Sequence, residues 1–153
     1  MTDIVDRQTR SRMMSKIGGR DTKPELLIRS GLHRLGFRYS LHRKDLPGKP
    51  DIVLPAYDTV IFVHGCFWHC HEGCEYFRMP KSNKQFWKDK LGGNKKRDQK
   101  NVKLLLSDGW YVGTVWECVT RNRTDEQIER AVKRIANWIA REAYKRQKME
   151  FTS

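Results

Sequence analysis

The stretch Asp51-Ile-Val-Leu-Pro-Ala-Tyr-Asp-Thr-Val-Ile-Phe-Val-His64 contains two apolar runs separated by a turn. Residues 51–54 and residues 59–63 each predict a strand, and the second run is apolar and, apart from Phe62, β-branched, which is typical of a strand buried in the middle of a sheet. The turn is too short for a crossover, so the two strands should pair antiparallel. Antiparallel pairing would make Asp51, at the start of one strand, a neighbour of His64, at the end of the other.

On the N-terminal side, Thr22-Lys-Pro-Glu25 matches a helix capping box, and the helix that it opens should end at Gly36. Residues 37–41 alternate apolar and polar side chains and predict a strand. Residues 45–50 are dense in turn residues. Residues 1–20 are polar, and we interpret them as an arm attached to the folded domain.

On the C-terminal side, Ser82-Asn-Lys-Gln85 matches a second capping box, and we expect the helix that follows to be interrupted at Gly92-Gly93. A further helix is predicted over residues 94–107, a strand over residues 110–116, and a long helix after a third capping box, Thr124-Asp-Glu-Gln127. The last strand needs a crossover connection, so the order of elements predicts an α/β fold in which a mixed sheet is flanked by helices.

The charge of the 153-residue chain, +13 at pH 7, points to nucleic acid. Residues 1–50 carry twelve basic and five acidic side chains, and residues 78–103 carry ten and two, whereas residues 51–77 contain no Lys or Arg. Basic flanks around an acidic centre suit a protein that binds a polyanion and holds cations at the reacting phosphate. A basic surface without catalytic activity is the alternative.

The length of the chain fits one domain, which we place at residues 21–153, with residues 1–20 as the arm. No segment has the roughly 20 apolar residues that a membrane span requires, and the N-terminus has no apolar run of a secretory signal. We therefore expect a cytoplasmic, monomeric protein with no membrane contact, whose four cysteines are thiols or metal ligands.

The segment His64-Gly-Cys-Phe-Trp-His-Cys-His-Glu-Gly-Cys74 holds three histidines and three cysteines. Thiolates and imidazoles at short spacing are zinc ligands, and metal binding can order a loop that has no core of its own. Cys118, at the end of a predicted strand, could supply the fourth ligand. Unliganded thiols are the alternative, and the residue types alone leave open which histidine binds and whether Cys70 takes part.

Asp51 offers a hard oxygen ligand where a strand carbonyl and waters could complete a Mg²⁺ site, although an aspartate in a turn is also commonplace. Phe67 and Trp68 lie between the expected zinc ligands on a polar loop. They could pack over the metal, or they could be wedges that enter a base stack.

Several segments then combine into a recognisable pattern: Thr9-Arg-Ser-Arg-Met-Met14, Asp21-Thr22, Glu25, Leu46-Pro-Gly-Lys-Pro-Asp51, Val60-Ile-Phe-Val-His-Gly-Cys-Phe-Trp-His69, Phe86-Trp87, Asn94, Arg97-Asp98 and Val115-Trp-Glu-Cys118. Together they closely resemble the very-short-patch-repair (Vsr) endonucleases over nearly the whole chain. The resemblance implies a restriction-endonuclease-like αβββαβ core related to the PD-(D/E)xK nucleases, with a structural zinc site. It also implies a bacterial enzyme, associated with the nucleoid when bound to DNA.

The activity implied by the resemblance is a Mg²⁺-dependent nick on the 5′ side of the thymine in a T:G mismatch, which arises when 5-methylcytosine deaminates. Asp51 and the main-chain carbonyl of Val63 would hold the Mg²⁺. His64 and His69 would act at the scissile phosphate. The further active-site acids would be Glu25 and Asp98, which we expect to orient histidines and metal-bound water.

The resemblance further implies that the zinc ligands are Cys66, His71, Cys74 and Cys118. Met14, Phe67 and Trp68 match residues that insert into the base stack beside the mismatch, although Met14 could simply pack the arm onto the domain. The implied substrate is double-stranded DNA with a T:G mismatch, and mismatch-repair and repair-polymerase proteins are candidate partners.

Two other hypotheses are kept beside this one. The chain could be a non-catalytic, zinc-dependent nucleic-acid-binding module, in which Asp51 is merely a turn residue. It could also be a nuclease with another target, either a restriction-type enzyme or one that acts on a different mismatch.

Overall fold

The structure, a computed structural model, describes residues 21–141 and 149–152. The predicted arm, including Met14, lies outside the described residues. The elements follow in this order: α2 (Lys23–Arg34), β1 (Ser40–Leu41), β2 (Ile52–Leu54), a 3₁₀ helix (Pro55–Tyr57), β3 (Thr59–His64), α3 (Lys84–Ser107), β4 (Tyr111–Trp116), a second 3₁₀ helix (Glu117–Val119), α4 (Asp125–Ile139) and β5 (Met149–Phe151). None of the helices in these ranges combines the length and the apolar character needed to cross a bilayer.

The five strands form one mixed sheet in the order β1-β2-β3-β4-β5. β1 and β2 pair antiparallel, as do β2 and β3, where Ile52 lies opposite Ile61. β3 and β4 run parallel, as do β4 and β5. The prediction of a mixed α/β sheet flanked by helices is therefore confirmed, and it fits a restriction-endonuclease-like fold.

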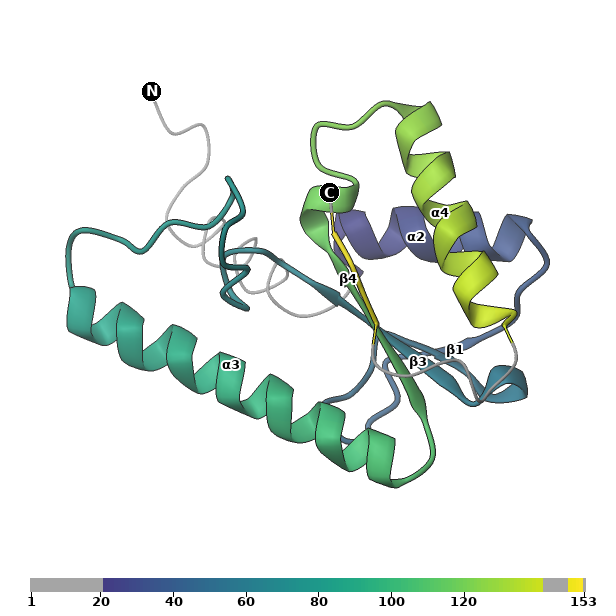
Figure 1. The fold of residues 1–153 in the computed structure, drawn as a ribbon, viewed down its shortest axis with the longest axis horizontal. Coiled ribbons are helices and arrows are strands. Elements are labelled where there is room, and N and C mark those ends of the chain that lie inside the picture. Colours follow the sequence, from purple (N-terminus) through teal and green to yellow (C-terminus); the bar gives the residue numbers. More distant parts are fainter. Residues whose placement is uncertain (1–20, 142–148, 153) are drawn as a thin grey trace, which may run out of the picture.

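Helices cover both faces of the sheet (Figure 1), with α2 and α4 on one side and α3 on the other. The period of two along the strands explains this division, because successive side chains point to opposite faces. On β2 and β3, Ile52 and Ile61 join the core beneath α2 and α4. Val53 and Val60 join the core beneath α3.

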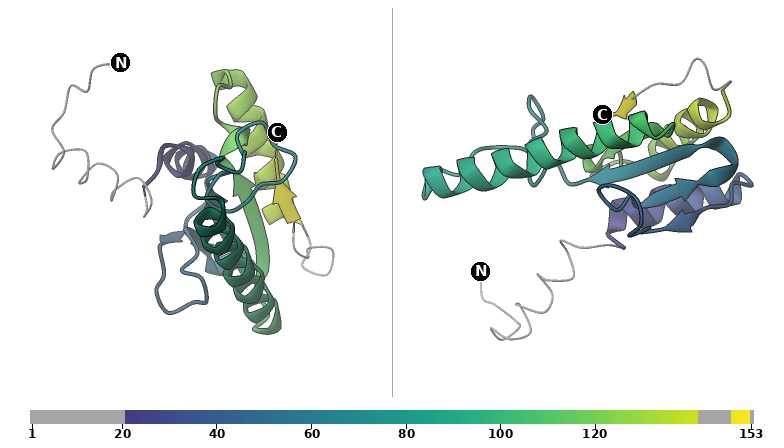
Figure 2. Two further views of the ribbon diagram at one scale, coloured as in Figure 1. Left: turned by 90° about the vertical axis from the view of Figure 1, so that its left-hand side faces the viewer. Right: turned by 90° about the horizontal axis from the view of Figure 1, so that it is seen from below.

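α3 differs from its prediction. It runs unbroken from Lys84 to Ser107, so the interruption expected at Gly92-Gly93 is wrong. Each glycine costs a helix about 1 kcal/mol relative to alanine, but tertiary contacts flank the pair, because Leu91 is fully buried and Asn94 donates to the Trp68 carbonyl oxygen. The first half of α3 extends past the sheet toward the loop after β3 (Figure 2).

Two of the three predicted capping boxes also need correction. Thr124 and Gln127 make both reciprocal bonds, but at α2 only the Thr22 side chain caps, because the Glu25 carboxylate binds other groups. The box at Ser82 is absent, and α3 begins after Asn83, whose side chain makes no cap hydrogen bond.

The sheet also departs from expectation at its edges. The strand predicted over residues 37–41 shrinks to Ser40–Leu41, because Phe37 and Tyr39 pack against the core beneath α2 instead. β5 was not predicted, and Phe151 is buried beside Trp138 of α4.

Candidate functional site

Asp51 lies immediately before β2, and antiparallel pairing brings it to the end of β3. Its Oδ2 accepts a hydrogen bond from the backbone N–H of Val63 at 2.7 Å. Burial raises the pKa of Asp51 to about 7, against the opposing effect of the Val63 N–H, and the Glu25 carboxylate adds to the rise. A bound divalent cation would stabilise the charged form of such a carboxyl group.

Glu25 lies in the first turn of α2 and is only 1% exposed. Its carboxylate accepts from Arg29 Nη1 at 2.5 Å and from the backbone N–H of Asp21 at 3.2 Å. His42 Nε2 lies 3.0 and 2.9 Å from its two oxygens. Glu25 also interacts with Asp51, so the two carboxyl groups form one acidic site between α2 and the start of β2.

His64, which follows Val63 at the end of β3, forms a second group with His69. Their rings stack with centroids 3.7 Å apart and planes 4° apart. His69 Nδ1 lies 2.6 Å from Oδ2 of Asp98 on α3. Because a carboxylate only accepts, Nδ1 carries the proton and Nε2 is left to take or give one. This is the arrangement of a histidine oriented for general acid–base chemistry.

The loop after β3 and the end of β4 bring together Cys66, His71, Cys74 and Cys118, with the four donor atoms all within 4.8 Å of one another. Cys118 Sγ lies 3.7 Å from His71 Nδ1, and the His71 ring stacks on Trp116 with centroids 4.2 Å apart. Tetrahedral zinc with Zn–S and Zn–N bonds of about 2.3 and 2.0 Å requires ligand separations of roughly 3.5–3.8 Å.

The chemical nature of these four donors also fits zinc. Cys66 and Cys118 are fully buried. Burial raises the pKa of the Cys66 thiol, and the neighbouring thiols of Cys118 and Cys74 add to the rise. Thiolates in such a place require a cation to hold them.

Phe67 and Trp68 form an aromatic cluster with Phe77, Phe86 and Trp87. Trp87 of α3 lies 5.4 Å from Phe67 and 6.0 Å from Trp68, measured between ring centroids. Trp68 is 38% exposed and Phe86 is 58% exposed. The cluster therefore joins the loop to α3 and exposes large apolar rings to solvent. Exposed apolar patches are uncommon on soluble proteins and are typical of binding surfaces.

Three residues of this region were missed by sequence reasoning. His42 contacts Glu25, Trp87 completes the aromatic cluster, and Glu117 Oε1 accepts from the Cys66 N–H at 3.0 Å. Each acts through a partner distant in the sequence, so no local pattern marks it. The matches of Phe86-Trp87 and Val115-Trp-Glu-Cys118 to family segments are the signals that could have pointed to Trp87 and Glu117.

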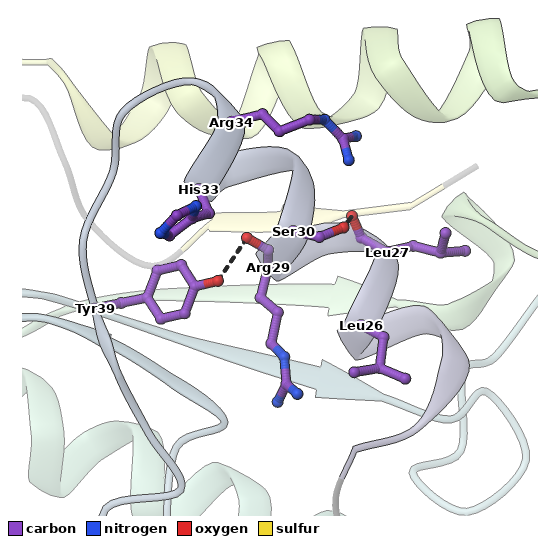
Figure 3. Close-up of a pocket in the computed structure, with 7 residues that line it drawn as sticks. All are labelled: Leu26, Leu27, Arg29, Ser30, His33, Arg34 and Tyr39. Atoms are coloured by element: carbon purple, nitrogen blue, oxygen red, sulfur yellow. Dashed lines mark hydrogen bonds between the residues drawn. The ribbon is translucent and has the colours of Figure 1, made fainter.

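A pocket of about 540 Å³ lies on the outer side of α2 (Figure 3). It is lined by Leu26, Leu27, Arg29, Ser30, His33, Arg34 and Tyr39. None of the sequence-predicted site residues lines it. Figure 3 shows the hydroxyl of Tyr39 donating to the backbone carbonyl of Arg29, at 2.7 Å, which anchors this turn of the helix.

A family model described as DNA mismatch endonuclease Vsr matches residues 2–75. The DNA mismatch endonuclease Vsr of Escherichia coli is 40% identical over 142 residues, which cover 93% of this chain and 90% of the relative.

Two type II nicking enzymes are also similar. V.NmeAIP of Neisseria meningitidis is 46% identical over 141 residues, covering 91% of this chain and all of the relative. V.XorIIP of Xanthomonas oryzae is 47% identical over 118 residues, covering 77% of this chain and 86% of the relative. At this identity and coverage, the chain belongs to the Vsr family of DNA mismatch endonucleases.

Proposed function

We propose that this endonuclease nicks one strand of duplex DNA on the 5′ side of the thymine in a T:G mismatch, in a Mg²⁺-dependent reaction. The observation that carries the proposal is the convergence of two groups at the end of β3. One is the Asp51 carboxyl bonded to Val63, and the other is the histidine pair with Asp98. Phosphodiester hydrolysis needs an acidic cation site and a proton-transfer group side by side.

Asp51 and the main-chain carbonyl of Val63 would hold the Mg²⁺, with Glu25 beside them. Oxygen donors of this kind suit Mg²⁺, and the raised pKa of Asp51 marks a carboxyl group whose charged form gains from a cation. When bound, the ion activates water and neutralises charge at the phosphate.

The histidines would move the protons. Asp98 fixes the His69 ring through Nδ1, so Nε2 is the atom that takes a proton from the attacking water or gives one to the leaving oxygen. His64 supports the plane of that ring by stacking on it, and it is the second imidazole available at the phosphate.

The Cys66, His71, Cys74 and Cys118 cluster would hold a structural zinc. Phe67 lies within the same loop as the first three ligands, so ordering this loop would set both His69 and the aromatic cluster.

Mismatch selectivity would come from the aromatic cluster. Phe67, Trp68 and, from the arm, Met14 would enter the base stack, since a mismatched step costs less to unstack than a paired one. The arm and the exposed lysines of α3 would contact phosphates. We also propose that residues 21–153 form a single domain.

The test is a strand-specific nicking assay on end-labelled duplexes that differ only in T:G, U:G or T:A, each with and without added Mg²⁺. A Mg²⁺-dependent nick 5′ of the mismatched T, lost in Asp51→Ala at unchanged zinc content, is the expected result. Equal cleavage of paired DNA would refute mismatch recognition and favour the restriction-type hypothesis. Phe67→Ala with Trp68→Ala should weaken discrimination more than total DNA binding.

A further inference from the structure

His42 makes a contact that the reaction scheme above does not use. Its Nε2 lies 3.0 and 2.9 Å from the two oxygens of Glu25. Because a carboxylate only accepts hydrogen bonds, Nε2 is the protonated nitrogen and donates to both oxygens. Arg29 Nη1 donates to the same carboxylate, so Glu25 is held by two side-chain donors from different parts of the fold.

The backbone of His42 is also unusual. Its φ is +49°, in the left-handed region that glycine adopts most readily and that residues with a side chain adopt less often. Its N–H donates to the carbonyl oxygen of Asp51 at 3.1 Å. One residue therefore links the loop after β1, the start of β2 and α2, in a conformation that glycine or asparagine would adopt more easily. The contact between the His42 side chain and Glu25 explains why a histidine occupies this position.

We propose that His42 is a positioning residue, which acts through Glu25 to hold that carboxylate against Asp51 so that the pair receives the divalent cation. Two adjacent carboxylates repel each other, and a buried carboxylate needs hydrogen-bond donors to offset the cost of its burial. Arg29, anchored at its carbonyl by Tyr39 (Figure 3), is the second donor. The inference rests on the proposed function, because it takes the Glu25 and Asp51 pair to be the Mg²⁺ site.

Three variants of one position separate positioning from a structural role. In His42→Gln, the amide nitrogen is as many bonds from Cα as Nε2, so a donor can still reach Glu25. In His42→Asn, the amide is one bond shorter and falls short, while the backbone is better suited than in the wild type. His42→Gly removes the side chain and tolerates the same φ.

The measurements are the Mg²⁺ concentration for half-maximal nicking of a T:G duplex and the rise in melting temperature when Mg²⁺ is added without DNA. Zinc content is the folding control. We expect His42→Asn and His42→Gly to need roughly tenfold more Mg²⁺ and to lose most of the Mg²⁺-induced rise, because a charge-assisted bond to the cation site is gone. His42→Gln should stay within about twofold of the wild type on the same scale.

Each of the following outcomes would overturn the inference. An unchanged Mg²⁺ requirement in the Asn and Gly variants overturns the inference, as does a Gln variant impaired as severely as both. Failure of both the Asn and Gly variants to fold would make His42 a structural residue and would also overturn it. A wild-type enzyme that nicks equally without Mg²⁺ refutes the proposed function, and the inference falls with it.

Discussion

Replacing Asp51 by asparagine should stabilise the Mg²⁺-free protein while abolishing nicking. The side chain keeps its size and an oxygen that can accept from the Val63 N–H, but it can no longer be charged. Burial raises the pKa of Asp51 from 3.8 to about 7, so ionising it in the folded state costs about 4 kcal/mol more than in the unfolded chain. The asparagine variant does not carry that cost.

The sign follows from proton binding. Between pH 3.8 and about 7 the folded protein holds a proton on Asp51 that the unfolded chain has lost, so the contribution of this group to stability is present at low pH and is lost as the pH rises through about 7. The stability gain in Asp51→Asn should therefore grow with pH. About 2 kcal/mol of the gain should develop between about pH 5.5 and pH 8.5.

The assay is urea unfolding of zinc-loaded wild type and variant at both pH values, in buffer without added Mg²⁺. A chelator is avoided because it would also remove zinc. Asp45→Asn is the matched control, because Asp45 is exposed and the Arg43 guanidinium lowers its pKa, so no gain at high pH is expected there. A gap between wild type and Asp51→Asn that does not change with pH would refute the reasoning.

Four further substitutions test individual contacts. Cys118→Ser should lower bound zinc well below one ion per chain and reduce the melting temperature, as measured by metal analysis and thermal unfolding, because a buried ligand is lost. Asp98→Asn should reduce kcat by about 10- to 100-fold without changing the Mg²⁺ requirement, because the neutral amide no longer stabilises a protonated His69 and can donate to Nδ1, which would select the other tautomer; a changed Mg²⁺ requirement would instead place Asp98 at the ion. Gly113→Ala should cost about 1–3 kcal/mol in urea unfolding, since its Cβ would lie 2.8 Å from the Trp138 ring. Gly92→Ala, with nothing within 4 Å, should stabilise α3 by up to about 1 kcal/mol, and equal effects of the two substitutions would contradict the packing argument.

The candidate site could be predicted in part because some of its chemistry is local. Three histidines and three cysteines fall within residues 64–74, and their density alone indicates a metal. Cys118 could be added because a strand end fixes its backbone. The choice of His71 as the histidine ligand needed either the family resemblance or the folded chain, in which its Nδ1 lies 3.7 Å from Cys118 Sγ.

The sequence by itself determined the features that depend on neighbours in the chain. These are the caps at Thr22 and Thr124, the two apolar runs within residues 51–63 and the antiparallel turn that brings Asp51 to the end of β3. They are readable because a cap or a turn is satisfied by groups a few residues away. The tertiary structure alone decided that α3 continues through Gly92-Gly93, that β5 joins the sheet, and that Glu25 binds His42 instead of completing the capping box at Thr22. Those outcomes depend on packing and hydrogen bonds between distant residues, whose free energies exceed the local preferences that they override.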